Sequence, residues 1–227
     1  MWHGTAHAAA ALQQRTPAWH AARRGKLTAS NVSAALGLSP YISRKTAFRR
    51  AMGLDKKFVD NNATRWGAVN EQNGVLAYKK TTGNAVEATG LHVHPTIAWL
   101  AGSPDGLVGT DGLLEVKCPY NGNAIYSSVP LHYYLQMHVC LEVTGRAWCD
   151  YISWSPASYI IYRIRRDNGL HKKLLPYYRV FHEAMQRKAH APPVLTDEDN
   201  AFIRAAVAES AERCVDKSKW GPRRITP

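Results

Sequence analysis

The chain has 227 residues, 45% of them hydrophobic, which is enough for one sizeable core and short for two independent ones. Its 29 Lys and Arg residues outnumber the 17 Asp and Glu residues and give a formal net charge of +12. Such a surplus indicates a polyanionic partner, most often nucleic acid, although ribosomal and membrane-surface proteins share it. No apolar run reaches the roughly 18 residues of a membrane span, so the sequence excludes a bilayer-crossing protein.

The cysteines give no sign of a disulfide framework or a zinc site. Cys118, Cys140, Cys149 and Cys214 show no CxxC spacing and lie in apolar or strand-like segments. This pattern indicates reduced thiols, and we therefore expect a cytoplasmic protein. We expect a single domain over residues 1–227, with a core at about 15–190 and a basic C-terminal helix and tail at 194–227.

The first part of the chain predicts helices. Thr16 and Pro17 suit the N-cap and first turn of a helix that contains Trp19. Either Thr28 or Ser30 suits the cap of a second helix. Further helical segments are expected over residues 31–36, 46–52 and 63–82.

From residue 86 the pattern changes to short, alternating segments punctuated by glycines. Strands are expected over residues 91–94, 97–101, 105–109, 113–118, 147–154 and 159–164. Helices are expected over residues 130–143, 171–188 and 196–217, with Pro192 and Pro193 separating the last two. This order predicts an α/β fold with a central mixed sheet of about five strands, flanked by helices.

The candidate catalytic residues lie in a predicted hairpin. In the segment AGSPDGLVGTDGLLEVKCPY, Asp105 and Glu115 lie at the two ends of a glycine-rich turn. Glu115 and Lys117 are two residues apart on one strand, so their side chains share a face, and the carbonyl of Val116 lies between them. Such oxygen ligands suit Mg²⁺ or Mn²⁺, which would polarise a phosphate while Lys117 positions the nucleophile or stabilises developing charge. The hairpin therefore predicts hydrolysis of phosphodiester bonds.

The same residues also fit an ordinary surface hairpin. Asp105 follows Pro104 and suits a turn, and alternating charged residues are common on half-exposed strands. For the bare spacing, this surface interpretation is the more frequent one. The assignment therefore depends on other segments of the chain.

Four segments supply that context: WHAARRGKLTAS at 19–30, RWGAVNE at 65–71, AGSPDGL with LEVKCP at 101–119, and YYLQMHVCLEVTG at 133–145. Together they resemble the lambda exonuclease-like alkaline exonucleases, the phage recombination nucleases also called the YqaJ family, which have a PD-(D/E)XK nuclease core. They follow the family's order and cover roughly residues 15–165. The nuclease core motif alone is weak, whereas the four segments together are specific.

The resemblance implies a role for each matching residue of the hairpin. Asp105 and Glu115 match the metal-binding carboxylates, Val116 the ligand carbonyl, and Lys117 the catalytic lysine. Glu71 matches a catalytic helix carboxylate that holds a second metal ion or its waters. Without the resemblance, a lone Glu on a helix is more often a surface residue.

The resemblance further implies a pocket for a 5′-terminal phosphate. The matching residues are Arg23, Ser30, Ser103 and Gln136. An Arg beside hydroxyl and amide donors suits a phosphate dianion, although each residue alone has an ordinary structural explanation. Arg24 adjoins Arg23, which leaves a shift of one residue open. The family often has Gln where this chain has His138, whose role is open.

The implied activity is a Mg²⁺-dependent 5′→3′ exonuclease on double-stranded DNA ends, with two ions expected and Mn²⁺ able to substitute. It releases nucleoside 5′-monophosphates and leaves a 3′ tail for a single-strand-annealing recombination protein, from a ring-shaped homotrimer. The basic residues Arg44, Lys45, Arg49 and Arg50 are candidates for duplex contacts, although a solvated basic face fits them equally well. The alternatives are a PD-(D/E)XK endonuclease or repair nuclease on nicked or branched DNA, and a non-catalytic DNA-binding module.

Overall fold

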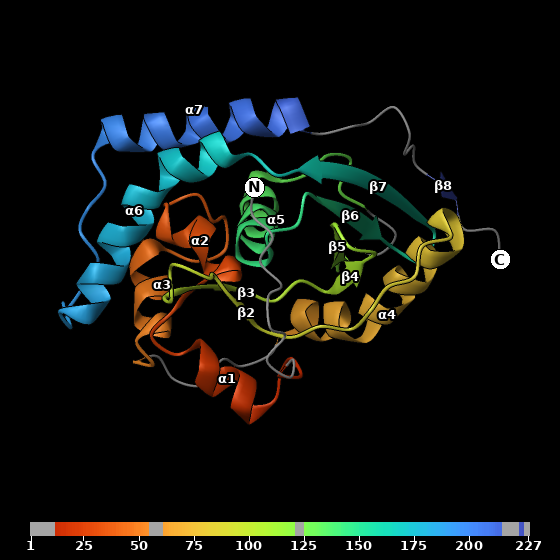
Figure 1. The fold of residues 1–227 in the computed structure, drawn as a ribbon, viewed down its shortest axis with the longest axis horizontal. Coiled ribbons are helices and arrows are strands. Elements are labelled where there is room, and N and C mark those ends of the chain that lie inside the picture. The colour runs from red at the N-terminus through yellow and green to blue at the C-terminus, as the bar shows by residue number, and fades with distance from the viewer. Residues whose placement is uncertain (1–11, 55–60, 121–124, 215–222, 225–227) are drawn as a thin grey trace.

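The computed structural model describes residues 12–54, 61–120, 125–214 and 223–224 (Figure 1). The helices are α1 (Pro17–Arg23), α2 (Ala29–Ala35), α3 (Arg44–Ala51), α4 (Asn62–Thr82), α5 (Leu131–Thr144), α6 (Asn168–Gln186) and α7 (Asp197–Cys214). The strands are β1 (Leu27–Thr28), β2 (His92–Val93), β3 (Leu100–Gly102), β4 (Gly106–Val108), β5 (Gly112–Lys117), β6 (Trp148–Trp154), β7 (Ser158–Arg165) and β8 (Arg223–Arg224). The predicted α/β class is confirmed, and most predicted boundaries hold to within a few residues.

The described strands form two sheets. The larger one has the order β4-β5-β6-β7-β8, and within it β5 and β6 run parallel while the other neighbours run antiparallel. This is the predicted central mixed sheet of about five strands. The segments expected at 91–94 and 97–101 do not join it, because they form β2 and β3, which pair with β1 in a separate sheet of three strands. The short strands β1 and β8 were not predicted.

Helix α5 makes the crossover that parallel neighbours require between β5 and β6. Residues 134, 135 and 137–143 of this helix are buried, so α5 lies inside the molecule rather than on its surface. In Figure 1, α2, α3, α6 and α7 lie on the same side of the large sheet as α5, and α4 lies across its other side. The sheet is therefore covered on both faces.

The side chains of β5 alternate between two hydrophobic cores. Leu113 belongs to the larger core, which it shares with α2, α3, α5, α6 and α7. Leu114 and Val116 belong to a smaller core beneath α4. Successive side chains of a strand point to opposite faces, so Glu115 and Lys117 point with Leu113 toward the α5 side.

His138 has a structural position. It is 1% exposed, and its Nε2 lies 2.8 Å from the backbone oxygen of Asp167, the N-cap residue of α6. The Asp167 carboxylate in turn accepts from the backbone N–H groups of Gly169 and Leu170. His138 thus joins α5 to the start of α6.

The charge of the C-terminal helix differs from the prediction. Helix α7 begins with Asp197, Glu198 and Asp199, and acidic residues at this end of a helix interact favourably with its dipole. The expectation of a basic helix was therefore wrong, and residues 215–217 of the predicted helix lie outside the described residues. Within the described part of the chain, every helix is too short or too polar to span a bilayer.

Candidate functional site

Asp105 lies immediately before β4 and faces β5. Its backbone N–H donates to the oxygen of Leu114 at 3.1 Å, and its Oδ2 accepts from the backbone N–H of Val116 at 2.7 Å. The N–H and C=O of one strand residue point to the same edge, so the carbonyl of Val116 also faces the Asp105 edge. The turn between the strands uses Gly109 at φ +52°. The hairpin therefore turns the Asp105 carboxylate and the Val116 carbonyl toward the same edge of β5.

Glu115 and Lys117 interact on the α5 side of the sheet. Nζ of Lys117 donates to Oε1 of Glu115, and Nε2 of Gln136 on α5 donates to the same oxygen at 2.5 Å. Nζ of Lys117 also lies 4.8 Å from the ring centroid of Tyr133, where the aromatic face attracts a cation. Helix α5 thus fixes both charged side chains of β5.

Three charged groups of the hairpin perturb one another. Burial raises the pKa of Glu115, with Lys117 opposing the rise. Burial and then the charge of Glu115 raise the pKa of Asp105, again opposed by Lys117. For Lys117, burial lowers the pKa, but the charges of Glu115 and Asp105 outweigh it and the net shift is upward. Crowded carboxylates of this kind favour an added cation.

Glu71 approaches the same site from α4. Its side chain is 34% exposed, and its Oε2 accepts from the guanidinium of Arg15 at 2.6 Å. Its negative charge also contributes to the upward pKa shifts of Asp105, Glu115 and Lys117. The structure therefore brings Glu71 into electrostatic contact with the hairpin residues.

These oxygen atoms fit a hard divalent cation. Glu115 is 1% exposed, and its Oε2 has no hydrogen-bond partner among the described residues. A buried carboxylate oxygen without a partner is costly unless a ligand satisfies it. Asp105, Glu71 and the Val116 carbonyl offer further oxygen atoms of the kind that Mg²⁺ prefers.

Arg23 belongs to a second polar group, at the end of α1. Its guanidinium donates to Oγ of Ser30 at 2.9 Å and to Oγ1 of Thr28 at 3.1 Å, and it stacks over the ring of Trp19 at 4.0 Å from the centroid. Nε1 of Trp19 donates to Oγ of Ser103 at 3.0 Å, which places that hydroxyl in the same group. Burial lowers the pKa of Arg23 to about 10, and Cys140 opposes this shift. A half-buried guanidinium whose described partners are hydroxyls is suited to bind an anion.

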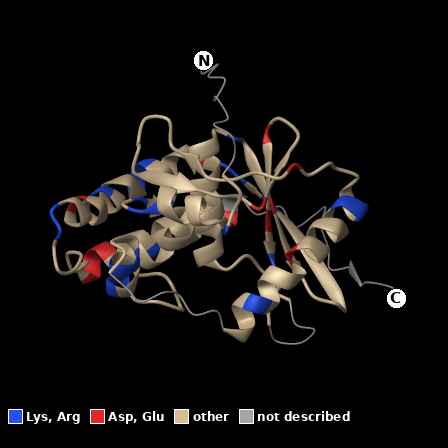
Figure 2. Cartoon of the chain, turned by 90° about the horizontal axis from the view of Figure 1, so that it is seen from below, with Lys and Arg blue, Asp and Glu red and all other residues tan. Residues whose placement is uncertain are grey.

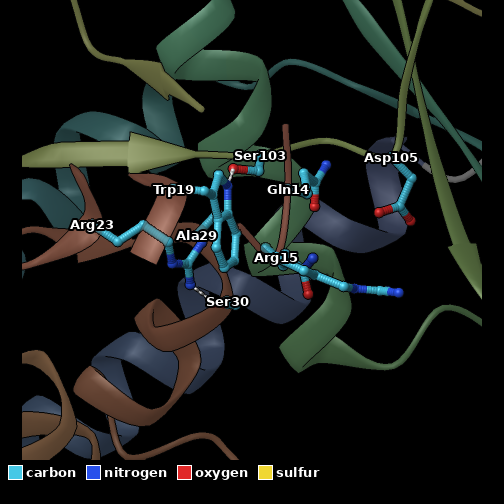
Figure 3. Close-up of a pocket in the computed structure, with 9 residues that line it drawn as sticks. Gln14, Arg15, Trp19, Arg23, Ala29, Ser30, Ser103 and Asp105 are labelled. Carbon is cyan, nitrogen blue, oxygen red and sulfur yellow. Dashed lines mark hydrogen bonds between the residues drawn. The ribbon is translucent and has the colours of Figure 1, made fainter. Parts of the chain in front are cut away.

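One pocket connects the two groups. It has a volume of about 190 Å³ and is lined by Gln14, Arg15, Trp19, Arg23, Ala29, Ser30, Ser103, Asp105 and Gln136. Figure 3 shows Arg23 and Ser30 on one side of this pocket and Asp105 on the other, with Trp19 and Gln14 between them. All four residues matched to the terminal-phosphate pocket therefore line the cavity that reaches the hairpin carboxylate.

Several residues of the pocket were not predicted. Gln14 and Arg15 precede the first helix in a segment without periodicity. Thr28, considered only as a helix cap, does not line the pocket but accepts a hydrogen bond from Arg23. Arg24 is exposed and does not line the pocket, which favours Arg23 over its neighbour. Trp19, expected only as part of the first helix, carries the Arg23 guanidinium on its ring.

The candidate duplex-binding residues do not line this pocket. Nε of Arg44 donates to the Ala35 oxygen at 2.6 Å, and its guanidinium lies over the ring of Phe181. This placement between helices does not favour a DNA contact for Arg44. Lys45, Arg49 and Arg50 are exposed on α3. In Figure 2, Lys and Arg residues occur mainly on helices, whereas acidic residues mark both strands near the middle of the view and helical segments at its left.

A further group of ionisable side chains, His94, Glu142 and His171, lies apart from the pocket, with ligand atoms within 4.8 Å of one another. Both carboxylate oxygens of Glu142 accept from Arg166, at 2.9 and 3.1 Å. Nδ1 of His94 accepts backbone N–H groups of the following turn. Nδ1 of His171 is buried and has no hydrogen-bond partner among the described residues, so this group is a second candidate metal site, separate from the hairpin.

Solved structures show what this arrangement is similar to. An alkaline exonuclease (LHK-Exo) from Laribacter hongkongensis is 28% identical with a TM-score of 0.64, over 86% of this chain and 99% of that one. Its complex with dAMP gives a TM-score of 0.65. A phage-related exonuclease from Haemophilus somnus 129PT, 14% identical with a TM-score of 0.51, covers 79% of this chain and 96% of that one and shares the fold. The fold is that of the PD-(D/E)XK nucleases.

Sequence comparison gives the family. Residues 18–147, more than half of the chain, match the YqaJ-like viral recombinase domain, and the chain belongs to this family. An uncharacterised protein, R354, of Acanthamoeba polyphaga mimivirus is 28% identical in an alignment of 158 residues, and the match covers 62% of this chain and 29% of that protein. Protein D345L of African swine fever virus is 29% identical in an alignment of 161 residues, and the match covers 58% of this chain and 46% of that protein. The chain thus spans less than half the length of these curated relatives.

Proposed function

We propose that the chain is a DNA exonuclease of recombination that digests double-stranded DNA from 5′ ends with the help of a divalent metal ion, Mg²⁺ or Mn²⁺. One observation carries the proposal. Arg23, Ser30, Ser103 and Gln136 line the same cavity as Asp105, so a site suited to a phosphate dianion adjoins a site suited to a metal ion. A terminal phosphate exists only at a DNA end, which favours an exonuclease over an endonuclease.

Each residue has a defined part in the proposed reaction. Arg23 and its hydroxyl neighbours hold the 5′-terminal phosphate by charge-assisted hydrogen bonds. The next phosphate along the strand then lies toward Asp105 and Glu115, which with the Val116 carbonyl and Glu71 would hold one or two ions. A bound ion supplies polarisation of the phosphate and a lowered pKa of a coordinated water. Lys117, kept protonated by its acidic neighbours, stabilises charge that develops on the phosphate oxygens.

The proposed bond changes leave a strand that can enter the same reaction again. Water forms a new bond to phosphorus, and the bond from phosphorus to the 3′ oxygen of the terminal nucleotide breaks. The leaving oxygen takes up a proton, which releases a nucleoside 5′-monophosphate. The shortened strand again begins with a 5′ phosphate, so the product of each cycle has the group that the Arg23 pocket is suited to hold.

The partners belong to the same proposal. Digestion of one strand leaves a 3′ single-stranded tail, the substrate of a single-strand-annealing recombination protein. The net charge of +12 supports duplex binding, and the assembly we propose is a ring-shaped homotrimer. Sedimentation of the purified protein with and without duplex DNA would establish the number of copies.

The decisive experiment compares three DNA substrates with and without Mg²⁺. We expect mononucleotide release from a 5′-phosphorylated linear duplex, slower release from the 5′-hydroxyl duplex, and none from closed circular DNA or in EDTA. Equal cleavage of all three substrates would favour an endonuclease. Binding without any nucleotide release, with or without the metal, would indicate a non-catalytic DNA-binding module.

A further inference from the structure

Arg15 has an unusual backbone conformation at the edge of the pocket. Its φ is +68°, in the left-handed region that side chains with a Cβ rarely adopt. Such outliers persist only when the surrounding structure fixes them, and they concentrate at functional sites. The conformation of Arg15 therefore requires an explanation.

The residues on either side hold Arg15 in place. Nε2 of Gln14 donates to the oxygen of Pro104 at 2.9 Å, next to Asp105 in sequence. Oγ1 of Thr16 donates to the Gln13 oxygen at 2.8 Å and accepts the N–H of Trp19, which caps α1. The backbone is thus anchored before and after Arg15, and the left-handed residue between the anchors turns its side chain toward the carboxylates.

The guanidinium of Arg15 has capacity for a second ligand. It donates to Oε2 of Glu71 at 2.6 Å, its only hydrogen-bond partner among the described residues, and the side chain is 58% exposed. A guanidinium carries five N–H donors, so one such bond leaves donors for a further ligand, and Arg15 lines the cavity. Figure 3 shows the guanidinium of Arg15 on the Asp105 side of the pocket, with Arg23 on the opposite side.

We propose that Arg15 is a further catalytic residue, which binds the phosphate between the first and second nucleotides of the strand. This inference rests on the proposed function. Without DNA, Arg15 offsets part of the negative charge of Glu71, which adds to that of Asp105 and Glu115. With DNA present, its guanidinium contacts the phosphate that is cleaved, while Arg23 holds the terminal one. Two arginines at the two ends of one pocket would thus hold successive phosphates.

The test measures binding rather than hydrolysis. Fluorescence anisotropy in Ca²⁺ gives the affinity for three 5′-phosphorylated duplexes, after gel analysis confirms that the DNA stays intact. The first duplex is unmodified, the second carries a neutral methylphosphonate at the first linkage, and the third carries it at the third linkage. The variants are Arg15→Gly, which suits the positive φ, and Arg15→Asn, since Asn also tolerates this conformation. Arg24→Ala is the matched control for loss of one positive charge.

We expect both Arg15 variants to weaken binding of the first and third duplexes by roughly tenfold or more, the range for a charge-assisted hydrogen bond. Binding of the second duplex should not change, because its first linkage has no charge to lose. Arg24→Ala should affect all three duplexes equally. An equal loss of affinity for all three duplexes, or no loss of affinity, in the Arg15 variants would overturn the assignment. This outcome is separate from the proposed function, which fails instead when the native chain releases no nucleotides.

A second measurement tests the contact with Glu71. In EDTA, Glu71→Gln should strengthen binding of the unmodified duplex, because it frees the guanidinium for phosphate. The double variant with Arg15→Asn should lose this gain. An equal gain in the double variant would mean that Glu71 acts only by repelling DNA, and would contradict an exchange of Arg15 between carboxylate and phosphate.

Discussion

Gly74 of α4 lies directly against Val116 of β5: a Cβ on residue 74 would come within 2.4 Å of Val116 Cγ1. This close approach sets the distance between α4 and the hairpin, and Glu71 lies on the same helix one turn earlier. We predict that Gly74→Ala forces the helix outward and lowers the free energy of unfolding by about 1–3 kcal/mol. DNA cleavage should fall as well, because Glu71 moves with the helix.

Gly67 is the matched control for that change, because it lies in the same helix and a Cβ there meets no atom within 4 Å. Gly67→Ala should leave stability unchanged or raise it by up to about 1 kcal/mol. Thermal unfolding and nucleotide release measured on both variants check the pair. Similar behaviour of the two variants would contradict the packing argument.

The second prediction concerns Lys117. Lys117→Ala removes the ammonium beside Glu115, and we expect nucleotide release to fall by about two to three orders of magnitude. Affinity for duplex DNA should change little, since many other basic residues contribute to it. Lys79→Ala, on the exposed side of α4, serves as the control. A Lys117→Ala enzyme with near-native rates would remove the basis of the mechanism.

The third prediction concerns Arg23. Its loss removes charge-assisted hydrogen bonds worth about 1.5–3 kcal/mol, so Arg23→Ala should reduce the preference for 5′-phosphorylated over 5′-hydroxyl ends roughly tenfold or more. Arg24→Ala, at the exposed neighbouring position, should keep the preference. Initial rates on the two kinds of end provide the measurement. If Arg24→Ala loses the preference for 5′-phosphorylated ends instead, the phosphate-binding arginine is Arg24 rather than Arg23.

The fourth prediction concerns metal binding without catalysis. Glu115 buries a carboxylate oxygen that has no described partner, so an ion that satisfies it should raise the melting temperature. At a hundredfold excess over its dissociation constant, a ligand adds about 2.7 kcal/mol, equivalent to several degrees for a chain of this size. The rise should appear with MgCl₂ and not with NaCl at equal ionic strength. Glu115→Gln should lose it, and an undiminished rise in that variant would place the ion elsewhere.

The fifth prediction follows from His138. Burial lowers its pKa from 6.5, while Glu142 and the Asp167 backbone oppose the shift and His171 adds to it. As the pH falls below 6.5, the unfolded chain therefore takes up a proton that the folded chain resists, and stability decreases. Urea unfolding between about pH 5 and about pH 7 should show this loss. His138→Gln should flatten the slope, and an unchanged slope would assign the effect to other histidines.

The local parts of the site could be predicted from the sequence. The tight turn and the two-residue period of a strand are sufficient to place Glu115 and Lys117 on one face of a hairpin that begins at Asp105. Likewise, Thr16 caps its helix as expected, because capping depends on neighbouring residues.

The distant contacts could not be predicted in this way. Leu27 pairs with Leu100, and Arg15 bonds Glu71 across 56 positions of sequence, and neither relation leaves a periodic pattern. The grouping of Arg23 with Ser103 was available only from resemblance to a family. Sequence periodicity specifies elements and their faces, whereas tertiary packing decides which elements meet.

Helix α5 is enclosed by the core over most of its surface, and one of its residues, Gln136, bonds Glu115 directly. Densely packed side chains resist the sliding of one element past another, so α5 and the strand that it supports keep a fixed position during the reaction. Under the proposed activity, repeated turnover would then require translocation of the polymer past a fixed protein. Binding of each newly formed 5′ phosphate at Arg23 would then favour movement of the DNA in one direction.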